Sequence, residues 1–503
     1  MASQLKYGVY LSYVTILVSN LTNLILTPFI ARNLGQSEYG LYMLIGALVG
    51  YIAVLDFGLG NATVRFVSKY RAEENKKGEE NFLASTLIIY IAISVLVGLI
   101  GTVIYFNIDY IFSSSLSANE LELAKIMFLI LVITLAFTLP MKLFTGIINA
   151  YERFAFPKSL VIIRLIIRAI IILLLLSLGF NAIAIVLVDA ILNLIMMFIS
   201  IVYVFVKLKV RFKLHQFNMK LIKEITSYSS LIFVSVIVDQ IYWRIGHLVL
   251  GIYASTTDVA IFAIGMIFGQ LFINFSTAIS GVFLPKVTKM IVKNASSHEL
   301  TRLLIRTGRL QFIVLGLALG GFLLFGQSFI QLWLGNGYEL SWYIALLVMI
   351  PLSVVLTQTI GITILQAKNM HGFRAITYLI ISLINLCISI YLVQIYGVIG
   401  ATLGTTLSLI VGNLIVMNIY YNYKVGLDMI AFFKGLTHKL LISLITSILI
   451  GYFLLDNSQI TWLGFSINAL IFCIIYGVIM YIYGMNKSEK DLINKEIKRV
   501  FKK

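Results

Sequence analysis

The sequence is poor in charge. Only 12% of its 503 residues are Asp, Glu, Lys or Arg, whereas 60% are hydrophobic, and the mean hydropathy is +0.99. A water-soluble chain of this length carries about twice that charged fraction and divides into domains joined by polar linkers. The composition therefore excludes an ordinary soluble protein and predicts an integral membrane protein.

Other absences narrow the chemistry. The two cysteines, Cys387 and Cys473, lie in separate apolar segments and are interpreted as small core residues. The five histidines are scattered, and no H-E-x-x-H or C-x-x-C pattern occurs, so we expect no metal site. Without a G-x-x-x-x-G-K-[ST] motif, ATP hydrolysis by that route is excluded. We expect neither an enzyme active site nor a cofactor.

Long apolar runs are abundant. A helix needs roughly 20 apolar residues to cross the hydrocarbon core of a bilayer, and this rule predicts about 14 transmembrane helices. They lie near 8–31, 40–66, 82–106, 121–148, 158–179, 181–206, 227–250, 258–284, 303–326, 340–365, 373–395, 397–420, 436–455 and 460–484. The first run has no cleavage site behind it and is interpreted as a retained helix. The predicted fold class is an all-α integral membrane protein.

Basic residues gather in every second connection between these spans, for example at 69–77, 151–158 and 207–213. Short basic loops stay in the cytoplasm, which places both termini there. Topology and anionic lipids account for the net charge of +17, so nucleic acid is not an expected partner. The lysine-rich stretch after residue 487 predicts an amphipathic surface helix.

A weak internal repeat is present. A shift of 220 residues lays Y-G-L-Y-M-L-I-G (39–46) on V-A-I-F-A-I-G-M (259–266) and V-S-K (67–69) on V-T-K (287–289). Repeats of this kind predict two six-helix bundles around a central cavity. The predicted domains are an N-terminal bundle (1–206), a basic cytoplasmic linker (207–226), a C-terminal bundle (227–420), an extra helix pair (421–486) and a cytoplasmic amphipathic tail (487–503).

A few charges fall at membrane depth, where they are costly and face a cavity or one another. The cations are Lys142, Arg164, Arg168 and Arg244, and the anions are Asp56, Asp189 and Asp239. At 1.5 Å per residue, Arg164 lies about 10 Å and Arg168 about 15 Å from the start of their helix, on one face of it. Arg164 can snorkel to the interface, whereas Arg168 indicates a cavity or a buried ion pair.

Arginine at this depth points to an anionic cargo. A guanidinium presents a planar fork that matches phosphate oxygens, so we expect Arg168, Arg244, Arg164 and Lys142 to bind a phosphorylated substrate. Snorkelling stays open for Lys142, and a structural ion pair stays open for Arg244. The three aspartates carry a coupling H⁺ or Na⁺ or neutralise the arginines, and both alternatives stay open.

The stretch A-R-N-L-G-Q-S-E-Y-G (31–40), followed by L-D-F-G-L-G-N-A-T-V-R-F (55–66), resembles the N-terminal signature of the Wzx-type polysaccharide flippases. These belong to the multidrug/oligosaccharidyl-lipid/polysaccharide exporter superfamily. The matching positions are Arg32, Gly35, Tyr39, Gly40, Gly58 and Arg65, and most are interpreted as turn, packing or interface positions.

The resemblance implies a cationic central cavity, alternating access and two six-helix bundles with an extra pair. The implied cargo is an undecaprenyl-pyrophosphate-linked oligosaccharide, moved across the bacterial cytoplasmic membrane for capsule, O-antigen, exopolysaccharide or teichoic acid synthesis. The implied partners are this lipid-linked sugar, membrane lipids and polysaccharide polymerase machinery. In such a mechanism the diphosphate meets Lys142 and Arg164 first and Arg168 and Arg244 next, with Pro28 as a candidate kink.

Three alternatives stay open. A lipid II flippase is a relative with the same span count, but it carries arginine in its first span, and here no charge lies between Lys6 and Arg32. A cation-coupled drug antiporter of the same superfamily needs a more acidic cavity. A polymerase or ligase needs a long outer loop, which the sequence lacks.

Overall fold

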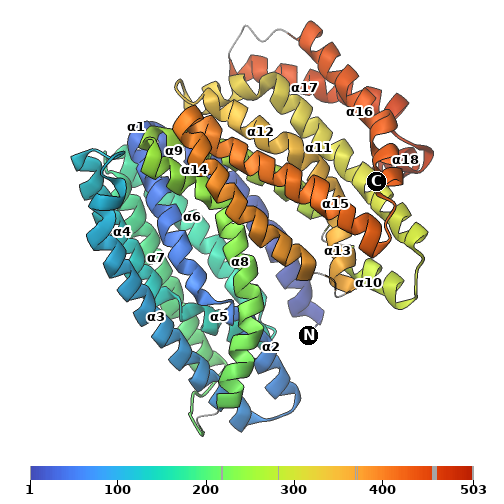
Figure 1. Ribbon diagram of the computed structural model, residues 1–503. Coiled ribbons are helices and arrows are strands. Elements are labelled where there is room, and N and C mark those ends of the chain that lie inside the picture. The colour runs from blue at the N-terminus through green and yellow to red at the C-terminus, as the bar shows by residue number, and fades with distance from the viewer. Residues whose placement is uncertain are drawn as a thin grey trace. The chain divides into compact units, whose positions relative to one another are not determined.

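The computed structural model describes residues 2–216, 219–280, 283–368, 370, 372–455 and 461–500, and every regular element in them is a helix (Figure 1). In this part of the chain, 11 helical segments are long and apolar enough to cross a membrane. Two of them, Tyr10–Ala72 and Gly372–Val425, contain 63 and 54 residues, each more than twice the roughly 20 needed for one crossing. The all-helical membrane fold is therefore confirmed, whereas the count of fourteen spans stays a prediction.

Contacts divide the chain into an N-terminal unit (Met1–Ala260) and a C-terminal unit (Ile261–Lys503). The boundary falls inside α9, so α8 groups with the N-terminal unit, and the sequence-based division at 207–226 stays a prediction. The α-helices are α1 (Ala2–Ile52), α2 (Leu59–Ala72), α3 (Lys76–Phe112), α4 (Ala118–Thr138), α5 (Met141–Ala150), α6 (Ala155–Ser177), α7 (Ala182–Val202), α8 (Met219–Tyr253), α9 (Thr256–Ser280), α10 (Leu284–Val292), α11 (Ser297–Leu334), α12 (Leu340–Val355), α13 (Thr359–Ala367), α14 (Gly372–Ser408), α15 (Met417–Tyr420), α16 (Met429–Leu454), α17 (Trp462–Ile479) and α18 (Lys487–Val500). Short 3₁₀ or π-helical turns join some of them: η1 (Ala53–Asp56), η2 (Tyr203–Lys207), η3 (Leu356–Gln358), η4 (Leu409–Val416), η5 (Tyr421–Val425) and η6 (Met480–Gly484).

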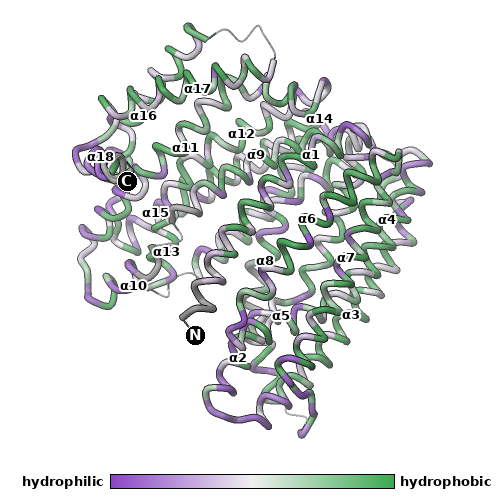
Figure 2. Tube along the Cα trace, turned by 180° about the vertical axis from the view of Figure 1, so that it is seen from behind, coloured by the Kyte–Doolittle hydropathy of each residue, from purple (hydrophilic) through white to green (hydrophobic). Residues whose placement is uncertain are grey.

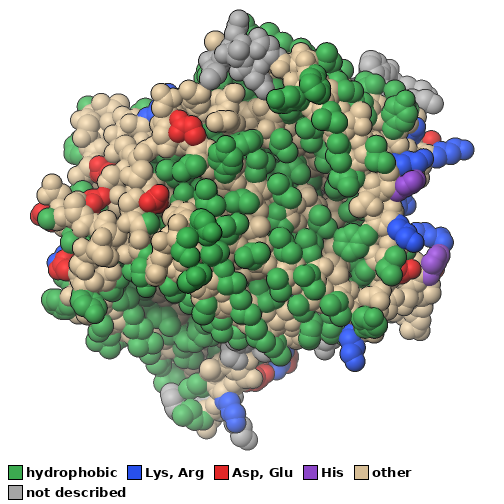
Figure 3. Space-filling model, turned by 45° about the horizontal axis from the view of Figure 1, so that its top comes forward, with side chains coloured by type: hydrophobic (Ala, Val, Ile, Leu, Met, Phe, Trp, Pro, Cys, Tyr) green, Lys and Arg blue, Asp and Glu red, His purple; other side chains and the backbone are tan. Residues whose placement is uncertain are grey.

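Polar residues mark the helix ends and apolar residues fill the middles. Ser117 and Glu120 form a reciprocal capping box at the start of α4, and Ser296 and Glu299 do the same for α11. Figure 2 shows hydrophobic residues along α3, α4 and α7 and hydrophilic ones around the end of α2. Hydrophobic side chains cover most of the face in Figure 3, and charged ones gather at its margins, as expected of helices that lie in lipid.

Several of the predicted spans contain an interruption of the α-helix. The predicted helix at 40–66 breaks between η1 and α2, where Phe57 and Gly58 both adopt left-handed angles, with φ of 52° and 71°. The helix predicted at 121–148 breaks between α4 and α5, at Pro140, which lacks a backbone donor. The helix predicted at 340–365 divides into α12, η3 and α13. The first two interruptions have a local cause, because consecutive left-handed residues or a proline cannot continue the hydrogen-bond ladder of an α-helix.

Two further glycines bend long helices. Gly35 in α1 has φ 73° and ψ 171°, and Gly397 in α14 has φ 56° and ψ −132°. Both values are outside the range of a right-handed helix and suit glycine. In α1 the departure from helical angles is at Gly35, whereas Pro28, the predicted kink, lies inside the helix.

The C-terminal helices are integral to the core of their unit. Leu440 of α16 and Phe472 of α17 share a buried hydrophobic cluster with Leu304 of α11. The tail helix α18 is attached by Glu489, whose two carboxylate oxygens accept bonds of 2.7 and 2.9 Å from Arg309 of α11. Arg309 is 8% exposed and Glu489 is 2% exposed, so α18 is anchored through the buried Glu489 in its first turn.

Candidate functional site

The most highly connected of the predicted charges is Arg168. Its Nε lies 2.6 Å from Asp189 Oδ1 and its Nη2 lies 3.0 Å from Oδ2, so the guanidinium binds the carboxylate with two parallel bonds. Nη2 also donates to the Tyr42 hydroxyl at 3.4 Å. The Arg168 and Asp189 side chains are only 16% and 17% exposed. We call Tyr42, Arg164, Arg168 and Asp189 the Arg168 cluster; it joins α1, α6 and α7.

Arg164 is held more loosely in the same cluster. Its Nη2 lies 3.6 Å from Asp189 Oδ1, and its side chain is 32% exposed. Its Nε is buried and has no hydrogen-bond partner in the described part of the chain. An unpaired buried donor is costly, so Arg164 can gain stability by donating to a bound anion. The corresponding donors of Arg168 are already bonded to Asp189.

Lys142 lies in a second group, the Asp56 cluster, which consists of Asp56, Tyr90 and Lys142. Lys142 Nζ lies 3.0 Å from Asp56 Oδ2, and the Tyr90 hydroxyl donates to Asp56 Oδ1 at 3.2 Å. The cluster lies at the helix interruptions, because Asp56 ends η1 and Lys142 is in the first turn of α5. The Lys142 side chain is 53% exposed, whereas that of Asp56 is 11% exposed.

Arg244 of α8 lies against α1. Its Nη1 is 3.5 Å from the Gly46 carbonyl oxygen, and a Cβ on Gly50 would come within 2.5 Å of Nη1. Glycine at position 50 therefore leaves the space that the guanidinium occupies. No ion pair is recorded for Arg244 among the described residues, and Asp239 is exposed on the same helix.

These contacts leave a surplus of positive charge in the N-terminal unit. In the two clusters three cations face two carboxylates, and with Arg244 and Asp239 of α8 the candidate residues comprise four cations and three carboxylates. The aspartates Asp56 and Asp189 are both ion-paired, which is one of the two roles left open by the sequence. A surplus of this sign can attract an anion.

The motif residues of the N-terminal signature divide into buried and exposed positions. Tyr39 is buried, and a Cβ on Gly40 would lie 1.8 Å from the Thr256 carbonyl oxygen, so α1 approaches the start of α9 closely. Gly58 supplies a left-handed residue before α2. Arg32 and Arg65 are exposed.

Sequence reasoning missed the two tyrosines of these clusters. Tyr42 and Tyr90 are two of 27 tyrosines, and no spacing distinguishes them, because their partners come from distant helices. Sequence reasoning also gave no sign of the role of Glu120, whose Oε1 accepts hydrogen bonds from the hydroxyls of Ser37 (2.5 Å) and Thr256 (2.7 Å).

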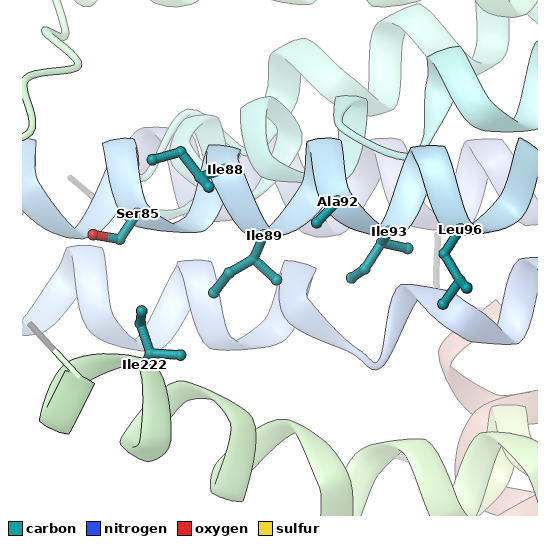
Figure 4. Close-up of a pocket in the computed structure, with 7 residues that line it drawn as sticks. All are labelled: Ser85, Ile88, Ile89, Ala92, Ile93, Leu96 and Ile222. Carbon is teal, nitrogen blue, oxygen red and sulfur yellow. The ribbon is translucent and has the colours of Figure 1, made fainter. Parts of the chain in front are cut away.

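The cleft in Figure 4 has a different character. Its lining is Ser85, Ile88, Ile89, Ala92, Ile93 and Leu96 of α3 with Ile222 of α8. None of the candidate cations lines it, so it is unsuited to an anionic group. Among the described residues, no three His, Cys, Asp or Glu side chains gather in a way that could hold a metal ion.

Comparison with known proteins gives one family and one shared fold. Residues 5–291 match the family described as polysaccharide biosynthesis protein. A probable low-salt glycan biosynthesis flippase of Haloferax volcanii is 24% identical over 391 residues, which are 77% of this chain and 77% of that one.

Two solved structures represent the fold. The lipid II flippase MurJ, in an inward closed conformation, matches 96% of this chain and 100% of its own, with a TM-score of 0.76 and 19% identity. An inward-facing multidrug resistance transporter of the MATE family, in the MOP superfamily, matches 79% of this chain and 92% of its own, with a TM-score of 0.58 and 16% identity.

Proposed function

The chain belongs to the polysaccharide biosynthesis protein family, and from this premise we propose that it flips undecaprenyl-pyrophosphate-linked oligosaccharide units across a bacterial cytoplasmic membrane. The family and the helical fold make it a multi-pass membrane transporter of the flippase type. The proposal adds the cargo, its direction from the cytoplasmic to the outer leaflet, and the cytoplasmic location of both termini.

The surplus of cations at membrane depth carries this proposal. A diphosphate linker is a compact anion that must cross hydrocarbon, and a guanidinium offers it a matched pair of donors. Arg164, with its loose contact to Asp189 and its unpaired buried Nε, and Arg244, with no recorded ion pair among the described residues, are the first candidates for cargo. Arg168 orients the cluster through Asp189.

The cycle we propose is alternating access of the two repeat halves. Lys142 and Arg164 receive the diphosphate from the cytoplasmic leaflet, Arg244 holds it next while Arg168 keeps Asp189 in position, and the lipid tail stays in the bilayer. Asp56, Asp189 and Asp239 are the candidates for coupling to H⁺ or Na⁺. Lipid II transport is the second candidate function, favoured by the match to MurJ over 96% of the chain.

A deletion strain tests the cargo. If the proposal holds, undecaprenyl-linked oligosaccharide units accumulate on the cytoplasmic side of the membrane. Accumulation of lipid II instead would establish the second candidate, and altered drug tolerance without a lipid intermediate would establish an antiporter.

Complementation of that strain tests the site. We expect Arg244→Gln to abolish translocation while the protein stays folded, because Arg244 packs against α1 through one long bond of 3.5 Å. Arg153→Gln, an exposed residue between α5 and α6, is the matched control and should complement fully. Full activity of Arg244→Gln would remove Arg244 from the cargo path.

A further inference from the structure

The Asp56 cluster combines a fixed anion with a movable cation. Asp56 is 8% exposed and is bonded through both oxygens, to Tyr90 and to Lys142. Lys142 has a side chain that is 53% exposed and a flexible four-carbon stem. The lysine can therefore leave the carboxylate, whereas the carboxylate stays where Tyr90 holds it.

The C-terminal unit shows that this place in the fold does not need charge. At the 220-residue shift of the repeat, Asp56 falls on Ser276 and Tyr90 falls beside Gln311. There Gln311 Nε2 donates to Ser276 Oγ at 3.0 Å and to Thr359 Oγ1 at 2.7 Å. Thr359 is the first residue of α13, as Lys142 is in the first turn of α5. Neutral side chains thus tie the helix interruption of the C-terminal unit.

An ion pair in the same place of the N-terminal unit needs another explanation. Only the Asp56 carboxylate is buried, whereas the Lys142 side chain is 53% exposed. Burying a carboxylate costs desolvation free energy, and an ion pair with a half-exposed lysine recovers little of it. Stability alone therefore does not account for Asp56 and Lys142. Because Asp56 is buried and Lys142 is half-exposed, Lys142 is able to leave Asp56 and pair with another anion.

We propose that Asp56, held by Tyr90, keeps Lys142 in a resting position from which an entering diphosphate takes it, and to which Lys142 returns when the diphosphate leaves. This inference rests on the proposed function, since the cargo supplies the competing anion. A diphosphate carries more negative charge than one carboxylate, so it attracts the ammonium more strongly at equal distance. Asp56 is then a positioning residue that weakens cargo binding and speeds its release.

The exchange predicts a distinctive kinetic result for Asp56→Asn. Asparagine keeps an oxygen for the Tyr90 hydroxyl but no charge for Lys142, so the lysine stays with the cargo. In proteoliposomes, we expect KM for a polyprenyl-diphosphate oligosaccharide and the turnover rate both to fall, by roughly 10-fold. Tyr90→Phe leaves the Asp56 carboxylate with one donor fewer, so Asp56 pairs more strongly with Lys142, and we expect KM to rise by about 3-fold. An unchanged or raised KM in Asp56→Asn, or an unchanged or lowered KM in Tyr90→Phe, would overturn the proposal.

The control removes a carboxylate from another ion pair of the same unit. Asp109 pairs with Lys125 at the far end of α3, with its side chain 57% exposed, and Asp109→Asn should leave both constants unchanged. Melting curves in detergent establish whether each variant is folded. If Asp56→Asn does not fold, the KM of Tyr90→Phe tests the proposal.

Binding of inorganic pyrophosphate separates this proposal from the function on which it rests. Asp56→Asn in detergent should bind pyrophosphate roughly 10-fold more tightly than the unmodified protein, and Asp109→Asn should not. Equal affinity in Asp56→Asn and the unmodified protein would reject the exchange. Tighter binding without oligosaccharide transport by the unmodified protein would reject the proposed cargo instead.

Discussion

Arg164 and Arg168 lie four residues apart on one helix and face the same aspartate, yet their chemical situations differ. Arg168 uses two donors on Asp189 at 2.6 and 3.0 Å and a third contact on Tyr42. Arg164 reaches Asp189 only at 3.6 Å. Depth in the membrane suggested Arg168 as the cargo residue, but its bonding favours a positioning role, and the looser Arg164 is better placed to exchange partners.

Substitution by glutamine should separate these two roles. Arg168→Gln removes both hydrogen bonds to Asp189 and leaves its buried carboxylate without a cation of comparable contact. An uncompensated buried charge is destabilising, so we expect a loss of about 2 kcal/mol in the free energy of unfolding. Arg164→Gln should reduce transport at least as much with a change in stability under about 1 kcal/mol. Thermal melting in detergent and proteoliposome transport measure the two effects. Equal destabilisation by both variants would contradict the division of roles.

At the scale of one element, the glycines of α1 serve different purposes. Gly40 lets α1 approach Thr256, and Gly50 makes room for Arg244, whereas a Cβ on Gly46 would meet no atom of the described residues within 4 Å. Close approach of helices in lipid depends on small residues at the contact. Only some glycines of this helix are therefore under packing constraint.

Alanine substitution should reveal this difference. In Gly40→Ala the new Cβ would lie 1.8 Å from a backbone oxygen, so the helices must separate, and we expect a loss of about 2 kcal/mol in the free energy of unfolding. Gly46→Ala should be neutral, or stabilising by up to about 1 kcal/mol, through the higher helix propensity of alanine. Melting curves in one detergent compare the two variants. A neutral Gly40→Ala would mean that the contact with Thr256 is readily relieved.

The existence of the helices could be predicted and their interruptions could not. Apolar runs determine where helices can cross a bilayer, but hydropathy does not predict the backbone conformation of single residues, such as the left-handed Phe57 and Gly58. For the site, the sequence yielded the cations and aspartates, because charge in an apolar run is conspicuous. It did not yield the pairings of Asp189 with Arg168 or of Asp56 with Tyr90, since these join helices that are distant in the sequence.

At the scale of the whole molecule, the two ends of the N-terminal unit are chemically distinct. At one end, Arg71 of α2 donates to the Ala150 carbonyl at 2.7 Å, which joins two of the basic connections. At the other end, Glu120 joins Ser37 and Thr256. The basic connections at 69–77 and 151–158 thus lie at one end of the helices of this unit, and the connection that contains Glu120 lies at the other.

Labelling of single cysteines tests this orientation. In a variant with Cys387 and Cys473 replaced by serine, we expect Asn119→Cys, beside Glu120, to react with a membrane-impermeant maleimide in intact cells. Lys77→Cys, in the first turn of α3 and at the end of the basic stretch 69–77, should react only after permeabilisation, since basic loops remain in the cytoplasm. The reverse labelling pattern would invert the topology.

The bond between Arg309 and Glu489 has a consequence for biogenesis. The two residues are 180 positions apart, so the ribosome delivers α11, with its arginine, long before the carboxylate that neutralises it exists. During that interval the guanidinium must lie at a wet interface or against a temporary partner, because an unpaired charge is unfavourable in hydrocarbon. The contact between α11 and α18 therefore forms only after Glu489 has been synthesised, and a chain that ends before Glu489 leaves Arg309 without this carboxylate.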